Sequence, residues 1–248
     1  MQTVRLTLEY HGGGFRGWAA QPGLRTVEQT VSDALATVLG SVPSLSVAGR
    51  TDTGVHARGQ VASFTVEGDS PDWARLTRSL NGVLPRDVSV VGAEPAAEGF
   101  DARRDARSRT YSYRVLARPE PSPLERDRAL WWPYRLDEEG LHACAAMVVG
   151  THDFTAFTPA QTDHVRFERD VLTAEWRRSG DVLELWIEAD TFMRHMVRVL
   201  VGTMLDVAAG RRDLEDFSRL LDGALRSEAG QTAEPYGLCL ERVRYQDA

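Results

Sequence analysis

The sequence predicts an α+β fold made of two successive βαββαβ halves with mainly antiparallel sheets. Strand-like alternation and helix-like apolar stripes follow one another along the chain, and the order β-α-β-β-α-β can be traced twice. One pair of strands in the second half is joined by a tight turn, which requires antiparallel neighbours. A chain of 248 residues that is 42% hydrophobic can bury two such cores. We expect one half over residues 1–102 and the other over 103–248.

The first strand and helix carry clear local signals. Apolar and polar residues alternate over residues 4–10, as in a half-buried strand. Thr26 is expected to cap a helix, and Gln29 completes a capping-box pattern. Gly40 is expected to end that helix. Its apolar stripe consists of Val27, Val31, Leu35, Val38 and Leu39.

The rest of the first half continues the pattern. Short strands are predicted near residues 45–48 and 60–66. Ser70 and Pro71 are expected to start a second helix, because proline suits the first helical turn. A strand over 88–92 closes this half.

The second half repeats the order. A strand is predicted over 110–117 and a helix over 138–149, ending at Gly150. Strands over 171–177 and 182–189 form a hairpin.

A long helix, a shorter helix over 214–221 and a strand over 238–245 complete the chain. The broad apolar face of the long helix comprises Met193, Met196, Val197, Leu200, Val201, Met204 and Leu205. Residues 118–128 form a surface excursion with three prolines. The two halves together predict a duplicated split-βαβ, or ferredoxin-like, fold.

The charge pattern is compatible with an acidic body that carries a basic stripe. The net charge is −7, and every one of the 29 basic side chains is arginine. Six arginines fall within one short stretch: Arg103, Arg104, Arg107, Arg109, Arg114 and Arg118. Such a stripe can bind phosphates although the protein is acidic overall.

No feature predicts a membrane or secreted protein. No apolar run approaches the roughly 20 residues that a bilayer requires, and the first residues lack the pattern of a signal peptide. Cys144 and Cys239 lie outside any metal-ligand spacing and are expected to be reduced thiols. We therefore expect a cytoplasmic protein.

Two glycine motifs near the N-terminus match functional patterns, but the surrounding sequence favours a structural role for both. Gly12, Gly14 and Gly17 spell GxGxxG, but Pro22 delays the helix that a dinucleotide site needs at once. The letters HGGG at residues 11–14 match an esterase oxyanion hole, but the chain has no GxSxG nucleophile elbow. We expect a tight surface loop here.

Asp52 lies in the most informative segment, GRTDTGVHA at residues 49–57. The letters DTG also occur in aspartic proteases, which need a second aspartate in a matching motif; this chain has no second DTG or DSG. A structural turn could use the same residues. Arg50, Asp52 and His56 in one short loop favour a site, because a nearby guanidinium keeps a carboxylate ionised and oriented.

Motifs along nearly the whole chain resemble those of the TruA-type tRNA pseudouridine synthases. GRTDTGVHA resembles their catalytic loop, with Thr53 where the family usually has Ala. YHGGGFRGWAAQ (10–21) resembles the segment YDG…F.GWQ.Q, with His11 and Ala19 in place of Asp and Gln. The remaining matches are Asn81 with Leu84 and Pro85, FDAR (100–103) with RTYSY (109–113), GTHDFTAF (150–157), FMRHMVR (192–198) with Gly202, and Gly237 with Leu238.

The resemblance implies a pseudouridine-synthase-type core and assigns four catalytic roles. Asp52 would be the catalytic aspartate, and Arg50 would take the vacated place of the target nucleotide or grip its phosphate. Tyr111 would stack on the uracil and is the candidate for proton abstraction at C5. Arg198 would pair with Asp52, so that the second half completes the active-site cleft.

The resemblance also implies the substrate and partners. These are uridines 38, 39 and 40 in the tRNA anticodon stem-loop, and a homodimer in which one tRNA touches both subunits. Neither a cofactor nor a metal is expected, because the reaction involves no redox change or phosphoryl transfer. The expected RNA contacts are Arg103, Arg107, Arg109, His56 and Arg58. The alternative is a non-catalytic RNA-binding module on a ferredoxin-like framework, although the segment from Arg58 to Phe64 lacks the inner aromatics of such modules.

Overall fold

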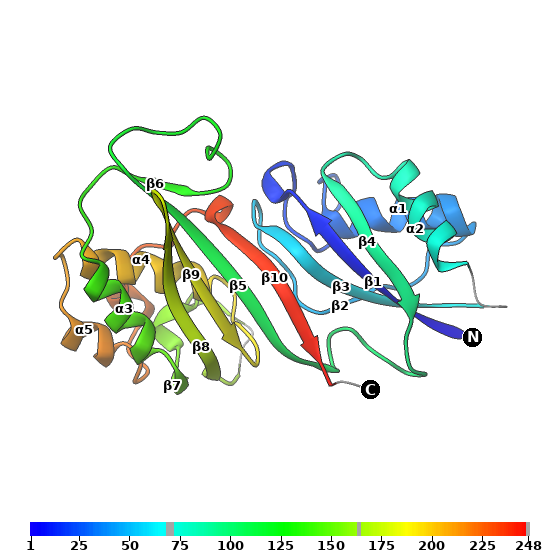
Figure 1. Ribbon diagram of the computed structural model, residues 1–248. Helices are drawn as coiled ribbons and strands as arrows, with labels where there is room; N and C mark the ends of the chain where they lie inside the picture. The colour runs from blue at the N-terminus through cyan, green and yellow to red at the C-terminus, as the bar shows by residue number, and fades with distance from the viewer. Residues whose placement is uncertain (68–71, 163–164, 247–248) are drawn as a thin grey trace. The chain divides into compact units, whose positions relative to one another are not determined.

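The computed structural model describes residues 1–67, 72–162 and 165–246. The chain divides into two compact units (Figure 1). The first comprises Met1–Arg107 with Leu240–Ala248, and the second comprises Ser108–Cys239. The last strand therefore begins in the second unit and continues in the first, whereas the sequence had suggested a division after residue 102.

The first unit is an antiparallel sheet with two helices. Its elements are β1 (Gln2–Tyr10), a 3-10 turn η1 (Gly12–Gly14), α1 (Val27–Leu39), β2 (Ser46–Val47), β3 (His56–Val66), α2 (Trp73–Val83), β4 (Val88–Pro95) and the C-terminal strand β10 (Leu238–Tyr245). The strand order is β4-β1-β3-β10, and β2 also pairs with β3. In the register, Leu6 faces Ala62 and Leu8 faces Gln60. The chain order β1-α1-β2-β3-α2-β4 is the split-βαβ order that the sequence predicts.

Local capping fixes the helices of this unit. Thr26 caps α1 by accepting a hydrogen bond from the Gln29 amide at 3.4 Å, and Gly40 ends it with φ +76. The Gln29 side chain donates to Asp33 instead of completing the capping box. Helix α2 is capped by Asp72. The start expected at Ser70 and Pro71 lies outside the described residues.

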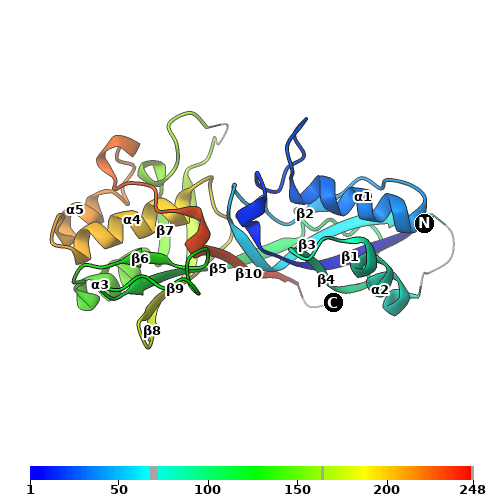
Figure 2. The ribbon, with the colours of Figure 1, turned by 90° about the horizontal axis from the view of Figure 1, so that it is seen from above.

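The second unit consists of mainly antiparallel strands with its own helices (Figure 2). Its elements are β5 (Ala106–Ala117), β6 (Leu130–Trp132), α3 (Glu138–Met147), β7 (Gly150–Asp153), β8 (Glu168–Ser179), β9 (Val182–Ala189), α4 (Met196–Ala208) and α5 (Leu214–Arg219), with 3-10 turns η2 (Thr155–Phe157), η3 (Arg226–Glu228) and η4 (Pro235–Gly237). The strand order is β5-β9-β8-β7, and β6 pairs in parallel with β5. Helix α3 packs against α4 and β8. The α+β class and the mainly antiparallel sheets are thus confirmed.

Several boundaries differ from the sequence prediction. Helix α3 ends at Met147, and Gly150, expected as its stop, begins strand β7 with φ +110. Met193 lies before α4, which starts at Met196 after His195 adopts a left-handed backbone with φ +62. The strands β6 and β7 were not predicted, because three or four residues are too few to show a strand period.

In the described part of the chain, no helix is both long enough and apolar enough to cross a bilayer.

Candidate active site

The Asp52 loop joins β2 to β3 through a tight turn. The Val55 amide donates to the Asp52 carbonyl at 3.1 Å, and Gly54 has φ +81. That backbone conformation suits glycine, which explains the glycine two residues after the aspartate. Arg50 is exposed and Asp52 half-buried. The turn therefore presents an arginine and a carboxylate on a short, defined stretch of backbone.

The glycine-rich N-terminal segment packs against this loop and is hydrogen-bonded to it. The Trp18 amide donates to the Thr51 carbonyl at 2.9 Å. The Gly12 amide donates to Nδ1 of His56 at 3.0 Å. A Cβ on Gly17, which has φ +90, would stand 3.0 Å from the Thr51 carbonyl oxygen. The expectation of a tight surface loop was thus incomplete, because Gly12 and Gly17 are buried against the aspartate loop.

An ion pair anchors the outer side of the glycine segment. Arg25 donates to both carboxylate oxygens of Asp87 at 2.7 and 2.8 Å, and its guanidinium lies 4.0 Å from the Phe15 ring centroid. The hydrogen bonds from Arg25 hold the pKa of Asp87 below its usual value. The Asp87 carbonyl also accepts from the His11 amide at 3.0 Å. The segment is therefore fixed to the stretch between α2 and β4 as well as to the Asp52 loop.

In the second unit, one face of β5 presents an arginine and two tyrosines. Arg109 is buried and donates to the Asp190 carbonyl at 2.8 Å. The Tyr111 ring meets Phe192 edge-on, with centroids 5.2 Å apart. Tyr113 is fully buried, and burial raises the pKa of its hydroxyl. Tyr111 thus lies between two anchored neighbours on the same face.

Arg198 lies in the first turn of α4 and is held by the segment that leads to β10. Its Nε donates to the Ala233 carbonyl at 2.8 Å, and the Ala233 amide donates back to the Arg198 carbonyl at 3.1 Å. A Cβ on Gly202 would stand 1.9 Å from the Gln231 carbonyl oxygen. The glycine one turn after Arg198 therefore permits the close approach of residues 231–233.

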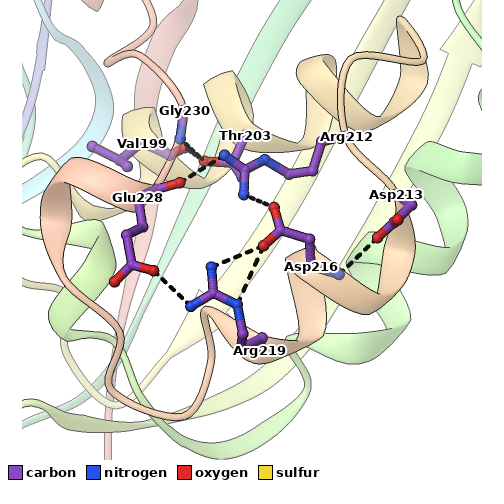
Figure 3. Close-up of polar contacts among 8 residues, drawn as sticks. All are labelled: Val199, Thr203, Arg212, Asp213, Asp216, Arg219, Glu228 and Gly230. Atoms are coloured by element: carbon purple, nitrogen blue, oxygen red, sulfur yellow. Dashed lines mark hydrogen bonds and ion pairs between the residues drawn. The ribbon is translucent and has the colours of Figure 1, made fainter.

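The preceding part of that segment is tied to α4 by a buried threonine. Figure 3 shows the Gly230 amide donating to the Thr203 hydroxyl, at 3.0 Å. The same hydroxyl donates to the Val199 carbonyl at 2.7 Å. Thr203 therefore joins the segment to the backbone of α4 one turn from Arg198.

An arginine–carboxylate network ties the segment to α5 as well (Figure 3). Asp216 pairs with both Arg212 and Arg219. Arg219 also contacts the Glu228 carboxylate at 2.7 Å, while Arg212 donates to the Glu228 carbonyl at 2.6 Å. Both ends of residues 228–233 are therefore fixed, one on α5 and the other on Arg198.

The nine predicted site residues are divided between the two units. Arg50, Asp52, His56 and Arg58 belong to one continuous loop and strand of the first unit. The second group, Arg109, Tyr111 and Arg198, belongs to the second unit. Arg103 and Arg107 lie in the first unit close to its boundary and are exposed.

The arginine-rich stretch is less open to phosphates than its sequence suggests. Arg109 is buried, as are Tyr111 and Tyr113 further along β5. Arg114 pairs with Glu125 and Glu184. Arg104, Arg107 and Arg118 contact Asp101, Gln246 and Asp181. Most of the stretch therefore makes contacts within the protein.

Three side chains around the aspartate loop were missed by sequence reasoning. These are Tyr10, Thr51 and Gln60, all buried. Tyr10 and Thr51 lie inside the quoted motifs, so their position in the motifs was a signal, but their mutual contact depends on the tertiary structure.

Among the described residues, no group of three or more His, Cys, Asp or Glu side chains could hold a metal ion. Cys144 is buried, and burial raises the pKa of its thiol to about 12. This thiol is therefore protonated and unreactive at neutral pH.

Comparison with known proteins gives a consistent result over the whole chain. The sequence profile of a family described as tRNA pseudouridine synthase matches residues 144–246. A Myxococcus xanthus protein named tRNA pseudouridine synthase A is 42% identical over 100% of this chain and 93% of its own length. Proteins of the same name from Frankia casuarinae and Bacillus pumilus are 45% and 36% identical, each over 98% of this chain and over 89% and 99% of their own lengths.

These matches define the class of protein as pseudouridine synthases, enzymes that isomerise uridine within RNA. Within that class, the chain belongs to the tRNA pseudouridine synthase A family. A crystal structure of a Cbf5-Nop10-Gar1 complex matches with a TM-score of 0.38 and 10% identity over 97% of this chain and 59% of that chain, a likeness too low to define a shared fold.

Proposed function

We propose that this chain converts uridine to pseudouridine at positions 38, 39 and 40 of the tRNA anticodon stem-loop, with Asp52 as the catalytic carboxylate. One observation carries the assignment to Asp52. The turn that bears it is fixed by backbone contacts from Trp18 and by the close approach of Gly12 and Gly17. Such rigidity is expected where a side chain must be held in a productive geometry.

In the proposed reaction, each bond that breaks is matched by one that forms. The N1–C1′ bond of the uridine breaks, the uracil turns, and a C5–C1′ bond forms. The proton on C5 leaves and N1 gains one, so that no electron acceptor is consumed. A single carboxylate can begin this sequence by attacking the base or the sugar, or by taking the 2′ proton.

Three other residues keep, in this proposal, the roles that the family resemblance implies. Arg50 is exposed next to the turn, where it can take the place of a flipped nucleotide or bind its phosphate. Tyr111 stacks on the uracil and accepts the C5 proton through its hydroxyl. Arg198 serves the Asp52 carboxylate as counter-charge.

RNA recognition in this proposal rests on the backbone and shape of the stem-loop. Arg103 and Arg107 are exposed, and we propose them as phosphate contacts together with Arg58 and His56. Arg109 is removed from this group, because its side chain is buried and contacts Asp190. We further propose a cytoplasmic homodimer in which one tRNA touches both subunits.

The direct test is to map the product. Purified protein is incubated with unmodified tRNA transcripts that have uridine at positions 38, 39 and 40, without added metal or cofactor. We expect pseudouridine at these positions and none in transcripts with cytidine there. Modification at other uridines would overturn the positional proposal.

The same experiment separates the enzyme from the alternative. A non-catalytic RNA-binding module would retain the tRNA in a binding assay and yield no pseudouridine at any position. A well-folded protein that behaved in this way would overturn the proposal.

A further inference from the structure

Three buried polar side chains meet beneath the Asp52 loop. The Tyr10 hydroxyl lies 2.7 Å from the Thr51 hydroxyl. The Gln60 amide nitrogen donates to the Gly49 carbonyl at 2.7 Å and to the Tyr10 hydroxyl at 3.3 Å. Tyr10, Thr51 and Gln60 are 3%, 6% and 0% exposed, so these contacts are shielded from water. All three residues belong to the first unit.

The orientation of the Gln60 amide follows from the groups around it. The Gln60 amide oxygen accepts from the Val61 backbone amide at 3.1 Å, so its nitrogen must be the atom that faces Gly49 and Tyr10. Because that nitrogen only donates, Tyr10 accepts from it, and in the hydrogen bond between the Tyr10 and Thr51 hydroxyls either oxygen can be the donor. The network thus connects β3 through β1 to the loop.

The two ends of this network hold the backbone on both sides of Arg50. Gln60 fixes the carbonyl of residue 49, and Tyr10 fixes the side chain of residue 51. The Trp18 amide fixes the carbonyl of residue 51 in addition. With residues 49 and 51 held inward, Arg50 points outward and Asp52 begins the turn at a defined position.

A buried polar network contributes less to the free energy of unfolding at this position than apolar side chains would. The strand neighbours of these side chains, Leu6, Leu8, Ala62 and Phe64, are buried and apolar. Burying hydroxyl and amide groups stabilises less than burying hydrocarbon of similar volume, because their hydration is lost. What hydrogen bonds supply is direction, which is what a catalytic loop needs.

We propose that Tyr10, Thr51 and Gln60 are positioning residues that set the direction of Asp52 and Arg50, an inference that rests on the proposed catalytic role of Asp52. None of the three touches the reacting atoms. Removing one hydroxyl leaves the fold and the RNA-binding surface intact and lets the turn depart from its productive geometry.

The test removes one hydroxyl at a time and keeps the shape of the side chain nearly unchanged. The variants are Tyr10→Phe and Thr51→Val, with Thr51→Ser as the conservative variant that keeps the hydroxyl. The matched control is Tyr245→Phe, which deletes a partly buried tyrosine hydrogen bond of the same unit, the one that Tyr245 donates to the Ala102 carbonyl at 2.8 Å. For each variant, kcat and KM for tRNA, the unfolding midpoint and amide hydrogen exchange of residues 49–55 are measured.

We expect Tyr10→Phe and Thr51→Val to lower kcat by about 10- to 100-fold with KM nearly unchanged, and to speed exchange in residues 49–55. Thr51→Ser should restore most of kcat, and Tyr245→Phe should change only the unfolding midpoint. The double variant should lose no more than the worse single one, because both remove the same contact.

Two results would overturn the inference. One is a wild-type kcat in Tyr10→Phe. The other is unchanged exchange in residues 49–55, and this readout does not depend on activity. An inactive wild type together with faster exchange in the variants would instead overturn the catalytic role of Asp52 and keep the network as a support of the loop.

Discussion

Gly12 lies so close to Val55 that a Cβ at residue 12 would stand 2.0 Å from the Val55 carbonyl oxygen. The same glycine donates its amide to His56, directly after Val55 in the chain. The Gly12 backbone thus meets the Val55 carbonyl and the His56 side chain, which belong to a segment more than forty residues away in sequence. This contact joins the glycine-rich N-terminal motif to the loop that carries Asp52.

Replacing Gly12 by alanine should therefore displace the Asp52 loop. The new methyl group collides with backbone, which cannot rotate away, so we expect destabilisation by about 1–3 kcal/mol and loss of most activity. Urea unfolding and pseudouridine formation on tRNA measure the two effects. Gly82→Ala is the control, since a Cβ there meets nothing within 4 Å. Wild-type activity in Gly12→Ala would show that the contact does not position the loop.

A parallel prediction concerns Gly202 in the second unit. Its Cβ would stand 1.9 Å from the Gln231 carbonyl oxygen, so Gly202→Ala should push residues 231–233 away from α4 and free the side chain of Arg198. We expect a lower kcat and faster amide exchange in residues 228–233. Gly92→Ala, with nothing within 4 Å of its Cβ, should change neither. Unchanged exchange in residues 228–233 of Gly202→Ala would contradict this account.

The Arg25–Asp87 pair predicts a stability effect that depends on pH. The pKa of Asp87 is lowered in the folded state, so its contribution is present above the unfolded value of about 4 and disappears as pH falls through the folded value. Asp87→Asn should therefore be less stable than the wild type at pH 6, and the difference should shrink steadily below pH 4. Urea midpoints measured from pH 6 to pH 2.5 test this. A difference that stays constant over that range would exclude the pair as its source.

The arginine stretch offers a test of RNA contact against structural role. Arg103→Ala should weaken tRNA binding at similar stability and reduce the slope of log K against log salt by about 1. Arg109→Ala should instead lower the unfolding midpoint, because the buried Arg109 side chain holds the Asp190 carbonyl. Binding titrations at several salt concentrations, with thermal unfolding of both variants, separate the two roles. An unchanged salt slope in Arg103→Ala would remove this residue from the RNA-binding surface.

The sequence predicted the elements whose signals are local. Thr26 and Gly40 marked the ends of α1, and the alternation in residues 182–189 gave β9 its correct bounds. Strand β7 was missed because its four residues have no readable period and because Gly150 was interpreted as a helix stop. Its pairing with β8 depends on residues about twenty positions further along the chain.

The residues of the candidate site likewise include some with a local sequence signal and some without one. Asp52 stands in a motif that can be read directly, so the sequence alone makes it the candidate for the catalytic carboxylate. Gln60 was not found, because a glutamine in a strand has no local sign of burial, and its partners Gly49 and Tyr10 reach it only through β-sheet pairing. The burial of Arg109 was not predicted, because charge density in a sequence does not tell which side chains face a core.

The measurement that tests the central claim most directly is release of tritium from tRNA labelled at C5 of uridine, with wild type, Asp52→Asn and Asp33→Asn compared. Asp33 is an exposed helical aspartate and serves as the matched control. We predict release by the wild type and by Asp33→Asn, and only background release by Asp52→Asn, which should still bind tRNA with wild-type affinity. Tritium release by Asp52→Asn at the wild-type rate would contradict the assignment of Asp52 as the catalytic carboxylate.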